Sequence, residues 1–439
     1  MAHRYPDSAV LYRALDRELP LIVRGDGVWL IDEHGQHYLD ACGGAYVANL
    51  GHGLSVVADA VADQIRRVAY VNGTAFTNEP VEQLAAELRA LAPRELDFAY
   101  FLSSGSEAVE AALKLARQYH VENGQPARHK VIARTPGYHG NTLFALSASA
   151  REHYKKMYGP YLVPVRMIGA PYPYRMDASD PAMTGLALEE AILAEGPETV
   201  SCFIAEPIGG SSTGGSVPPP GYWKTIREIC DRYGVLLIAD EVLTGAGRTG
   251  RWLACEHFDL RPDILTMGKG LSGGFVPLSA VMTTAKVLAP IAKGSGGFKH
   301  AQTFSHTPAI CAAGLAAVLH IREHELVARS ARMGELLHTR LASLLSLPHV
   351  GDVRGKGLLA GVELVLDKDT RAPFERSQKV AERLVANALD RGLVLWSNIG
   401  HADGERGDLV MVAPPFIITE DEVDTLVSRL ADSILATVG

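Results

Sequence analysis

The chain has 439 residues, which is too long for a small binding module and suggests two or three domains or one large enzyme-sized domain with attachments. Hydrophobic residues make up 47% and charged residues 21%, so a large buried core is available and wholesale disorder is not expected. The net charge is −8 and no long basic run occurs, which argues against nucleic acid or an anionic membrane as partner and favours a small molecule.

The cysteines and the apolar stretches indicate a cytoplasmic protein. Five cysteines are widely scattered without a C-x-x-C pair, which predicts neither a disulfide framework nor a zinc site. Residues 1–20 contain no apolar core of signal-peptide length, and the longest apolar stretch, at 309–321, is too short to span a bilayer. We therefore expect a reducing compartment and no membrane association.

The first recognisable element is a β-hairpin. Residues 28–32 (VWLID) and 37–41 (HYLDA) read as two strands joined by a turn, in which Gly35 is free to adopt a positive φ. This hairpin begins a smaller N-terminal lobe.

A mostly parallel sheet is predicted next. Short β-branched runs separated by helical patterns are typical of an α/β domain, whose active-site groups lie at the carboxyl ends of its strands. The predicted strands are 97–102, 130–134, 201–207, 235–242, 263–269 and 279–284. After residue 308 strands and helices no longer alternate regularly, which favours an α+β C-terminal lobe. The glycine-rich segments 209–215 and 294–297 are expected to be mobile loops.

The segment 103–120 begins with a helix-start signal. Ser104 and Glu107 have the S-x-x-E spacing of a capping box, and the small residues Gly105 and Ser106 occupy the first turn. Backbone N–H groups and the helix dipole at such a start suit a phosphate. The alternative is a capped helix that binds nothing.

Tyr138 and His139, in PGYHGNT (136–142), follow a predicted strand and so reach the same edge of the sheet. The aromatic face of Tyr138 is suited to stacking on a planar ring. The alternative is that Tyr138 is an ordinary core residue.

Asp240 and Lys269 each lie at the end of an apolar strand, about one strand–helix–strand step apart. An isolated carboxylate at Asp240 is costly to bury unless it pairs with a positive group. The amine of Lys269, among glycines in TMGKGLSGG, is expected to have a lowered pKa and to act as a Schiff-base nucleophile. The alternatives are a helix-capping or metal-binding Asp240 and a solvated loop lysine.

Two further motifs lack the context that their chemistry needs. GAGRTG (245–250) matches G-x-G-x-x-G, but no clear helix opens at it and no acidic residue follows at the right distance for a dinucleotide fold. GSSTG (210–214) matches G-x-S-x-G, yet VPPPG follows where a nucleophile elbow needs a helix.

Taken together, the segments resemble class III (ω-amino acid type) aminotransferases, which are pyridoxal-phosphate enzymes of fold type I. The similar segments occur in family order along nearly the whole chain: 43–53, 103–117, GYHG at 137–140, 205–207, 240–250, 266–274, 300–308, 353–358 and 413–419. The resemblance implies an α/β large domain, residues 61–320, with a mostly parallel sheet flanked by helices. It implies a smaller α+β domain built from residues 1–60 and 321–439.

The resemblance also implies the cofactor pyridoxal 5′-phosphate and a role for individual residues. Lys269 would bind the cofactor covalently and Asp240 would pair with its pyridine nitrogen. The remaining cofactor-binding residues would be Ser104, Gly105 and Ser106 at the phosphate, Tyr138 and Val242 on the two ring faces, His139 and Glu206 beside the ring, and Thr303 at the phosphate of the neighbouring subunit. A homodimer with shared sites follows, or a dimer of such dimers.

Four positions bear on the substrate. Met411 stands where glutamate-using relatives often carry an arginine for the α-carboxylate, so a substitute carboxylate ligand would be Arg406, unless that loop arginine faces solvent. Leu243 replaces a glutamine that would bond the cofactor's O3′. Tyr46 matches an aromatic that lines the substrate pocket, or else it only packs beside the hairpin.

The sequence therefore predicts a transaminase that moves an amino group from a primary amine, ω-amino acid or diamine to a keto acid such as pyruvate. The reaction would be ping-pong, through pyridoxamine phosphate. Alternatives are a racemase or epimerase with the same cofactor, a glutamate/2-oxoglutarate-dependent member of the family, or a cofactor-free binding protein on the same scaffold.

Overall fold

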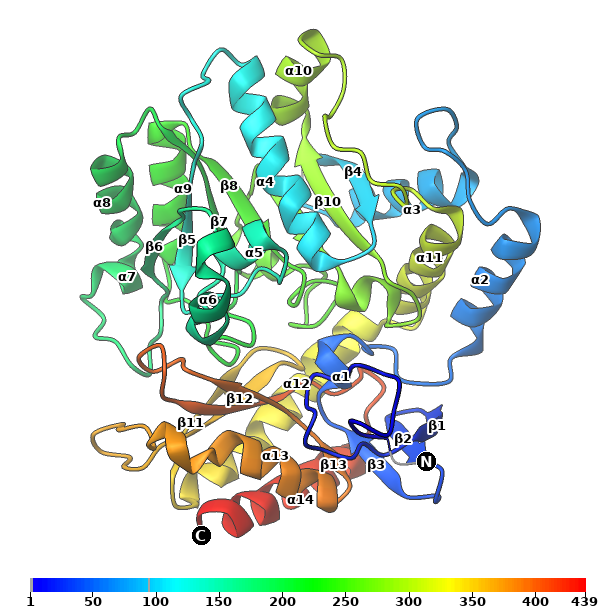
Figure 1. Cartoon of the computed structure of the whole chain (residues 1–439), viewed down its shortest axis with the longest axis vertical. Coiled ribbons are helices and arrows are strands. Elements are labelled where there is room, and N and C mark those ends of the chain that lie inside the picture. The colour runs from blue at the N-terminus through cyan, green and yellow to red at the C-terminus, as the bar shows by residue number, and fades with distance from the viewer. Residues whose placement is uncertain (1–2, 94) are drawn as a thin grey trace.

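The computed structural model describes residues 3–93 and 95–439 of the chain. Its strands form three sheets, of which a seven-stranded central sheet fills the upper part of the molecule in Figure 1. The strand order is β4-β10-β9-β8-β7-β5-β6. These strands are β4 (Leu96–Leu102), β5 (Lys130–Thr135), β6 (Arg166–Gly169), β7 (Val200–Ala205), β8 (Leu236–Asp240), β9 (Ile264–Met267) and β10 (Ser279–Thr284).

The central sheet is mostly parallel, which confirms the predicted fold class. All strands from β5 to β9 pair in parallel, whereas β10 is antiparallel to both of its neighbours, β4 and β9. Of these seven strands, sequence reasoning missed only β6. That strand is four residues long, lies at the edge of the sheet and has only one fully buried residue, Ile168, so it lacks an apolar run.

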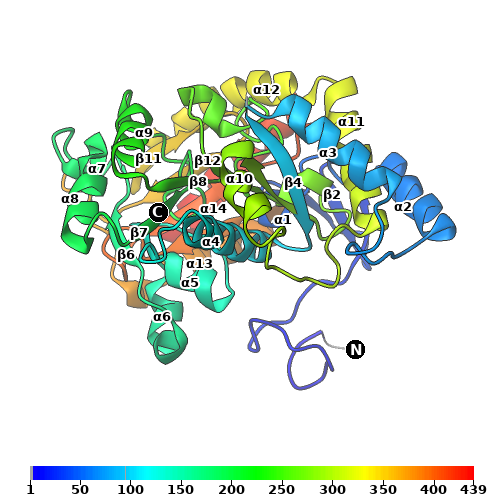
Figure 2. The ribbon, with the colours of Figure 1, turned by 90° about the horizontal axis from the view of Figure 1, so that it is seen from above.

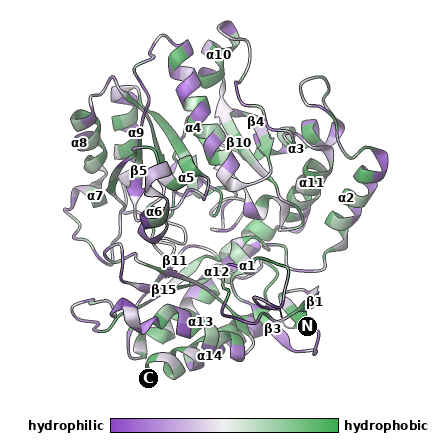
Figure 3. Ribbon diagram, in the orientation of Figure 1, coloured by the Kyte–Doolittle hydropathy of each residue, from purple (hydrophilic) through white to green (hydrophobic). Residues whose placement is uncertain are grey.

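Helices cover both faces of the central sheet, whose strands are predominantly hydrophobic (Figures 2 and 3). Alternate side chains along a strand point to opposite faces. Thus Ile204 and Ile238 belong to one buried cluster, and their strand neighbours Phe203 and Leu237 belong to another. The first cluster includes α4 (Gly105–Glu122), α5 (Leu143–Ala148) and α10 (Ala285–Lys293), and the second includes α3 (Glu79–Leu91), α8 (Leu186–Glu195), α9 (Tyr222–Tyr233) and α11 (Pro308–Glu323).

Two smaller four-stranded sheets lie in the lower part of Figure 1, close to both ends of the chain. One is built from β1 (Ile22–Asp26), β2 (Trp29–Asp32), β3 (His37–Asp40) and β13 (Leu393–Val394), and the other from β11 (Val350–Gly355), β12 (Ala360–Leu364), β15 (Asp408–Val412) and β14 (Trp396–Ile399). The predicted hairpin is confirmed as β2 and β3, with Gly35 at φ 78°. Because β13 pairs in parallel with β3, the two terminal parts of the chain share one sheet. Domain boundaries at residues 60 and 320 stay a prediction.

The remaining helices connect these sheets or pack against them. They are α1 (Gly43–Tyr46), α2 (Ser55–Arg67), α6 (Glu152–Tyr158), α7 (Pro181–Thr184), α12 (Leu326–Leu341), α13 (Val380–Asp390) and α14 (Glu420–Val438), with short 3-10 helices at Gly159–Tyr161, Ala254–Phe258, Lys269–Ser272, Ala342–Ser346 and Arg376–Gln378. No helix within residues 3–93 and 95–439 has the length and apolar character to cross a membrane. The five cysteines are buried and unpaired, and a cytoplasmic location stays a prediction.

The glycine-rich loop 209–215 differs from the sequence-based expectation. Every residue of this loop is buried, whereas a mobile surface loop was expected. The loop packs beneath the C-terminal sheet: a Cβ on Gly361 would lie 2.4 Å from the carbonyl oxygen of Gly214. Its glycines therefore permit a close approach between two parts of the backbone rather than freedom of motion.

Buried charges join the C-terminal sheet to the rest of the molecule. Glu363, on β12, lies between two arginines, because Arg354 Nη2 is 2.7 Å from Oε2 and Arg175 Nε donates to Oε1 at 2.7 Å. His401 Nε2 lies 3.1 Å from the same carboxylate. Burial alone raises the pKa of Glu363, but His401 and the two arginines lower it well below its usual range.

Replacing Glu363 with glutamine should lower the free energy of unfolding by about 3–5 kcal/mol, because the buried cations lose their counter-charge. The stabilisation by Glu363 is present above the ordinary glutamate pKa and is lost as the pH falls toward the lowered value. Urea denaturation followed by circular dichroism measures the change. Glu375→Gln is the matched control, since within the described part of the chain that exposed glutamate forms an ion pair with Arg406 alone. Equal effects of the two variants would contradict the account.

Candidate active site

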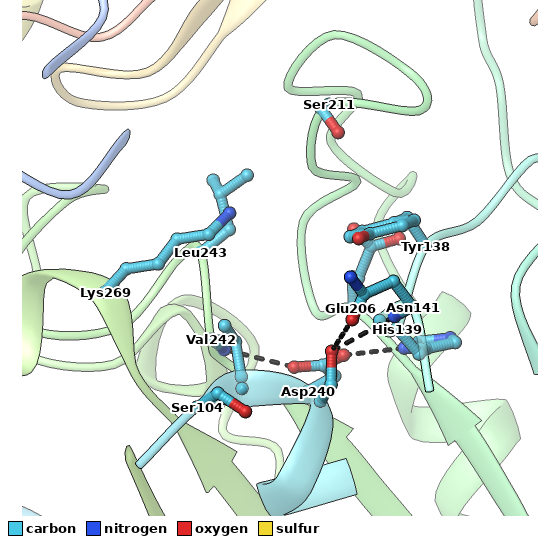
Figure 4. A pocket seen from close by; sticks show the side chains of 13 residues that line it. Ser104, Tyr138, His139, Asn141, Glu206, Ser211, Asp240, Val242, Leu243 and Lys269 are labelled. Atoms are coloured by element: carbon cyan, nitrogen blue, oxygen red, sulfur yellow. Dashed lines mark hydrogen bonds and ion pairs between the residues drawn. The ribbon is translucent and has the colours of Figure 1, made fainter. Parts of the chain in front are cut away.

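One pocket collects side chains from the carboxyl ends of the parallel strands, where sequence reasoning placed the site (Figure 4). Its lining is Ser104, Gly105, Ser106, Tyr138, His139, Gly140, Asn141, Glu206, Ser211, Asp240, Val242, Leu243 and Lys269. Nine of the ten predicted cofactor residues are therefore brought together. The tenth, Thr303, is an exposed residue between α10 and α11 and is not part of this lining.

The amino end of α4 forms one wall of the pocket. Ser104 is the N-cap, and its Oγ accepts a hydrogen bond from the N–H of Glu107 at 3.3 Å. Glu107 Oε2 accepts from the backbone N–H of Ser103 at 3.0 Å and from the Ser104 hydroxyl at 3.3 Å, rather than from the backbone N–H of Ser104, so the backbone half of the predicted capping box is displaced by one residue. A Cβ on Gly105 would lie 2.7 Å from Val242 Cγ1, so glycine lets the first turn of the helix approach the pocket. The free N–H groups at such a helix start are suited to an anion.

Asp240 ends β8 at the floor of the pocket and is only 4% exposed. Its Oδ2 lies 2.6 Å from His139 Nδ1, and its Oδ1 accepts from Thr266 Oγ1 at 2.9 Å and from Val242 N at 3.1 Å. Thr266 is the parallel-strand neighbour of Asp240 on β9. Three donors therefore fix the carboxylate in one orientation.

Lys269 follows β9 and extends into the pocket from the side opposite Tyr138 (Figure 4). Its backbone has a positive φ of 44°, an unusual conformation for a residue that is not glycine. Burial lowers the pKa of the amine to about 8, although Asp240 and Glu206 favour its charged form. The amine lies 4.8 Å from the centre of the Tyr46 ring. At pH 7 about a tenth of such an amine is neutral and nucleophilic, a far larger share than for a solvated lysine.

Glu206 and Leu243 complete the inner wall. Glu206 follows β7, and its Oε1 accepts from Gly210 N at 3.1 Å. Burial raises the pKa of this carboxyl against the opposing effect of His139 and Arg134. Leu243 lines the pocket with an apolar side chain, so it offers no hydrogen bond there.

A second pocket adjoins the first and shares Tyr138, Ser211 and Lys269 with it. The rest of its lining is Arg13, Ala45, Tyr46, Arg151, His153, Tyr154, Glu382, Trp396, Ser397, Asn398 and Ile399. Tyr46 was predicted to lie at the substrate, and it packs edge-on against Trp396 with ring centroids 6.2 Å apart. Because the lysine belongs to both linings, the second pocket is the natural place for a substrate.

Sequence reasoning missed several residues that line these pockets, among them Asn141, Ser211 and Arg151. Asn141 was within reach, because it stands two positions after His139 in the same loop. Ser211 was assigned to a mobile loop, and nothing in the local sequence around Arg151 distinguishes it from a surface arginine. Only the tertiary fold places both beside Lys269.

Arg406 lies outside both linings. Its guanidinium bonds to Asp403 at 2.7 Å and to Glu375 at 2.9 Å, and its side chain is 40% exposed. In this conformation its charge is already neutralised by neighbouring carboxylates. A role in substrate binding stays a prediction.

Comparison with known proteins agrees with this geometry. A profile of the family Aminotransferase class-III matches residues 12–434, so the chain belongs to that family and the protein is an aminotransferase. Enzymes of this class depend on pyridoxal phosphate. The architecture is that of fold type I, as the resemblance implied.

Relatives cover nearly the whole chain. An uncharacterised aminotransferase of Schizosaccharomyces pombe is 39% identical across 98% of this chain and 95% of its own. The diaminobutyrate–2-oxoglutarate transaminase of Halomonas elongata is 37% identical across 93% of this chain and 88% of its own. The crystal structure of a thermostable (S)-enantioselective ω-transaminase from Thermomicrobium roseum superposes with a TM-score of 0.90 and is 35% identical, over 96% of this chain and 94% of its own.

The lowered pKa of Lys269 predicts unusual reactivity in the protein without added cofactor. Its labelling rate with acetic anhydride should rise through a midpoint near pH 8 and level off above it, because only the neutral amine reacts. Mass spectrometry of the peptide that contains Lys269 measures its labelling rate at each pH. A free lysine peptide, whose amine has a pKa of about 10.4, is added as the reference. A midpoint equal to that of the free peptide would contradict the buried environment of the amine.

Proposed function

We propose that this aminotransferase binds pyridoxal phosphate in the pocket between Lys269 and Asp240. The observation that carries the proposal is the convergence, in one pocket, of a buried amine with a lowered pKa, a fixed carboxylate and the amino end of a helix. These residues fit the cofactor: α4 suits its phosphate, Asp240 suits a protonated ring nitrogen, and Lys269 suits its aldehyde.

The cofactor, when bound, supplies an aldehyde that condenses with amines and a pyridinium ring that accepts the electron pair of a broken Cα–H bond. Asp240 then holds the proton on the ring nitrogen, and its bonds to His139 and Thr266 keep it in place. Lys269 Nζ takes the proton from the substrate's α-carbon and delivers it as general base and acid.

We propose that the donor is a primary amine, ω-amino acid or diamine and that the acceptor is a keto acid such as pyruvate, with ping-pong kinetics. The aromatic walls formed by Tyr46 and Trp396 support a donor with an apolar substituent. Met411 is fully buried in an apolar cluster that includes Tyr46, so it offers no charge for the α-carboxylate of glutamate. A donor panel against pyruvate and 2-oxoglutarate decides between the acceptors.

Replacing Lys269 with alanine should abolish the visible absorbance of the holoenzyme and lower turnover by several orders of magnitude, because the protein loses both its covalent link and its proton carrier. Asp240→Asn should keep the absorbance but lower kcat strongly, since the ring nitrogen loses its counter-charge. Absorbance spectra and single-turnover rates with an amine donor measure both effects. Multiple turnover by Lys269→Ala at the wild-type rate would end the proposal.

We propose further that the active unit is a homodimer in which Thr303 reaches the phosphate of the neighbouring subunit. The exposed position of Thr303 supports this, and so do the adjacent aromatic side chains. Phe304 is 57% exposed and Tyr70 is 45% exposed, and their rings lie 6.2 Å apart. Large apolar side chains that remain exposed together are typical of an interface.

Phe304→Asp should shift the protein from dimer toward monomer, because a buried charge would be left without a partner at the interface. Sedimentation equilibrium measures the mass. Leu193→Asp is the control, since Leu193 is a comparable exposed apolar residue, at 56%, on α8, and Figure 1 shows α8 far from α10 and α11, the helices that flank position 303. An unchanged mass for Phe304→Asp, or an equal decrease for the control, would contradict this interface.

A further inference from the structure

Arg151 stands at the start of α6 and contributes its side chain to the second pocket, together with Lys269 and Tyr46. The guanidinium carbon lies 5.1 Å from the centre of the Tyr138 ring. Arg151 Nη2 donates to Ser211 Oγ at 3.0 Å. The arginine is thus held by an aromatic face and a hydroxyl, both of which also line the first pocket.

The charge of Arg151 has no carboxylate to balance it. Among the described residues, none of the ion pairs involves Arg151. Its Nε is sealed from solvent and has no hydrogen-bond partner within the described part of the chain. Burial lowers the pKa of the guanidinium against the opposing effect of nearby Tyr46, Tyr138 and Glu206. A partly desolvated cation without a counter-charge is costly, and an anion that enters the pocket lowers that cost.

Several other arginines of the described chain have carboxylate or carbonyl partners. Arg354 and Arg175 share Glu363. Arg248 is buried as well, but its Nη1 donates to the carbonyl oxygens of Leu358 at 3.0 Å and Pro414 at 2.6 Å. Arg406 pairs with Asp403 and Glu375, outside the pocket.

The carboxylate in the pocket lining does not serve Arg151 either. Glu382 is ion-paired with Arg376 instead. The pocket therefore presents Arg151 and the neighbouring Arg13 to whatever enters it, and Arg13 is already bonded to Tyr154 at 2.7 Å.

We propose that Arg151 binds the carboxylate of the amino-acid or keto-acid substrate while the substrate's nitrogen or carbonyl group lies at Lys269. This inference rests on the proposed function and narrows it: one half-reaction uses a substrate that carries a carboxylate. Arginine suits the task because its planar fork donates two parallel hydrogen bonds to a carboxylate. Arg151 is then a specificity-determining residue, in the place where the resemblance suggested Arg406.

Two donors test the proposal on the holoenzyme, because alanine and isopropylamine differ only in a carboxylate that replaces a methyl group. The loss of visible absorbance on mixing gives kcat/KM for each half-reaction, with racemic alanine to cover both enantiomers. Arg151→Met should lower kcat/KM for alanine on the order of 10- to 100-fold, whereas kcat/KM for isopropylamine should stay within about 3-fold of the wild-type value. Arg151→Lys keeps the charge but loses the fork, and should fall between wild type and Arg151→Met.

A binding measurement gives a second readout that does not depend on turnover. Propionate has the carboxylate of alanine without the amine, and its dissociation constant, measured by calorimetry with the holoenzyme, should rise about 10-fold or more in Arg151→Met. Lys156→Met is the matched control, because it removes a positive charge from an exposed position of α6, the helix that follows Arg151. It should leave kcat/KM for both donors and the dissociation constant of propionate unchanged.

The outcomes separate the two proposals. If no amine, keto acid or amino acid changes the absorbance of the wild-type holoenzyme, the proposed function fails. If the wild-type enzyme reacts but Arg151→Met lowers kcat/KM equally for both donors, Arg151 only positions Tyr138 and the inference is overturned. Wild type that rejects alanine and propionate, or a selective loss of alanine in Arg406→Gln instead of Arg151→Met, overturns it as well.

Discussion

The site depends on one buried amine, that of Lys269, which lies near the carboxylates of Asp240 and Glu206. Lys269 is desolvated, which favours the neutral amine, while Asp240 and Glu206 favour the charged one. Desolvation is the stronger effect, so the pKa settles near 8 and the amine is poised to react. A solvated lysine at the same point in the chain would be protonated at neutral pH and would have little nucleophilic character.

The central sheet supplies the geometry that this chemistry needs. Parallel strands end at one edge, so residues from β5, β7, β8 and β9 meet although they are far apart in the sequence. Asp240 and Thr266 are register partners on adjacent strands, which fixes the carboxylate with a threonine hydroxyl at 2.9 Å. The sheet thus positions the charged groups, and the helices that cover it exclude water from them.

The C-terminal sheet closes the site over the central one. Buried arginines make the connection: Arg248 reaches carbonyl groups of the C-terminal segment, and Arg354 shares Glu363 with Arg175. The loop 209–215, packed below β12, brings Ser211 into both pockets. Trp396 on β14 then packs edge-on against Tyr46 in the lining of the second pocket. The lining of the second pocket is therefore built from segments near both ends of the chain.

The sequence by itself determined the parallel sheet and the hairpin, because these follow from apolar runs and glycines whose spacing is local. It also singled out the start of α4, Tyr138, Asp240 and Lys269, while the other residues assigned to the cofactor came from the resemblance to the family. Only the tertiary structure decided which arginine enters the substrate pocket. Arg151 has no distinctive neighbours in the sequence. The folded chain shows that Arg406 is paired with Asp403 and Glu375, whereas Arg151 lines the second pocket without an ion-pair partner among the described residues. Charge balance in a pocket is a long-range property, so local patterns do not encode it.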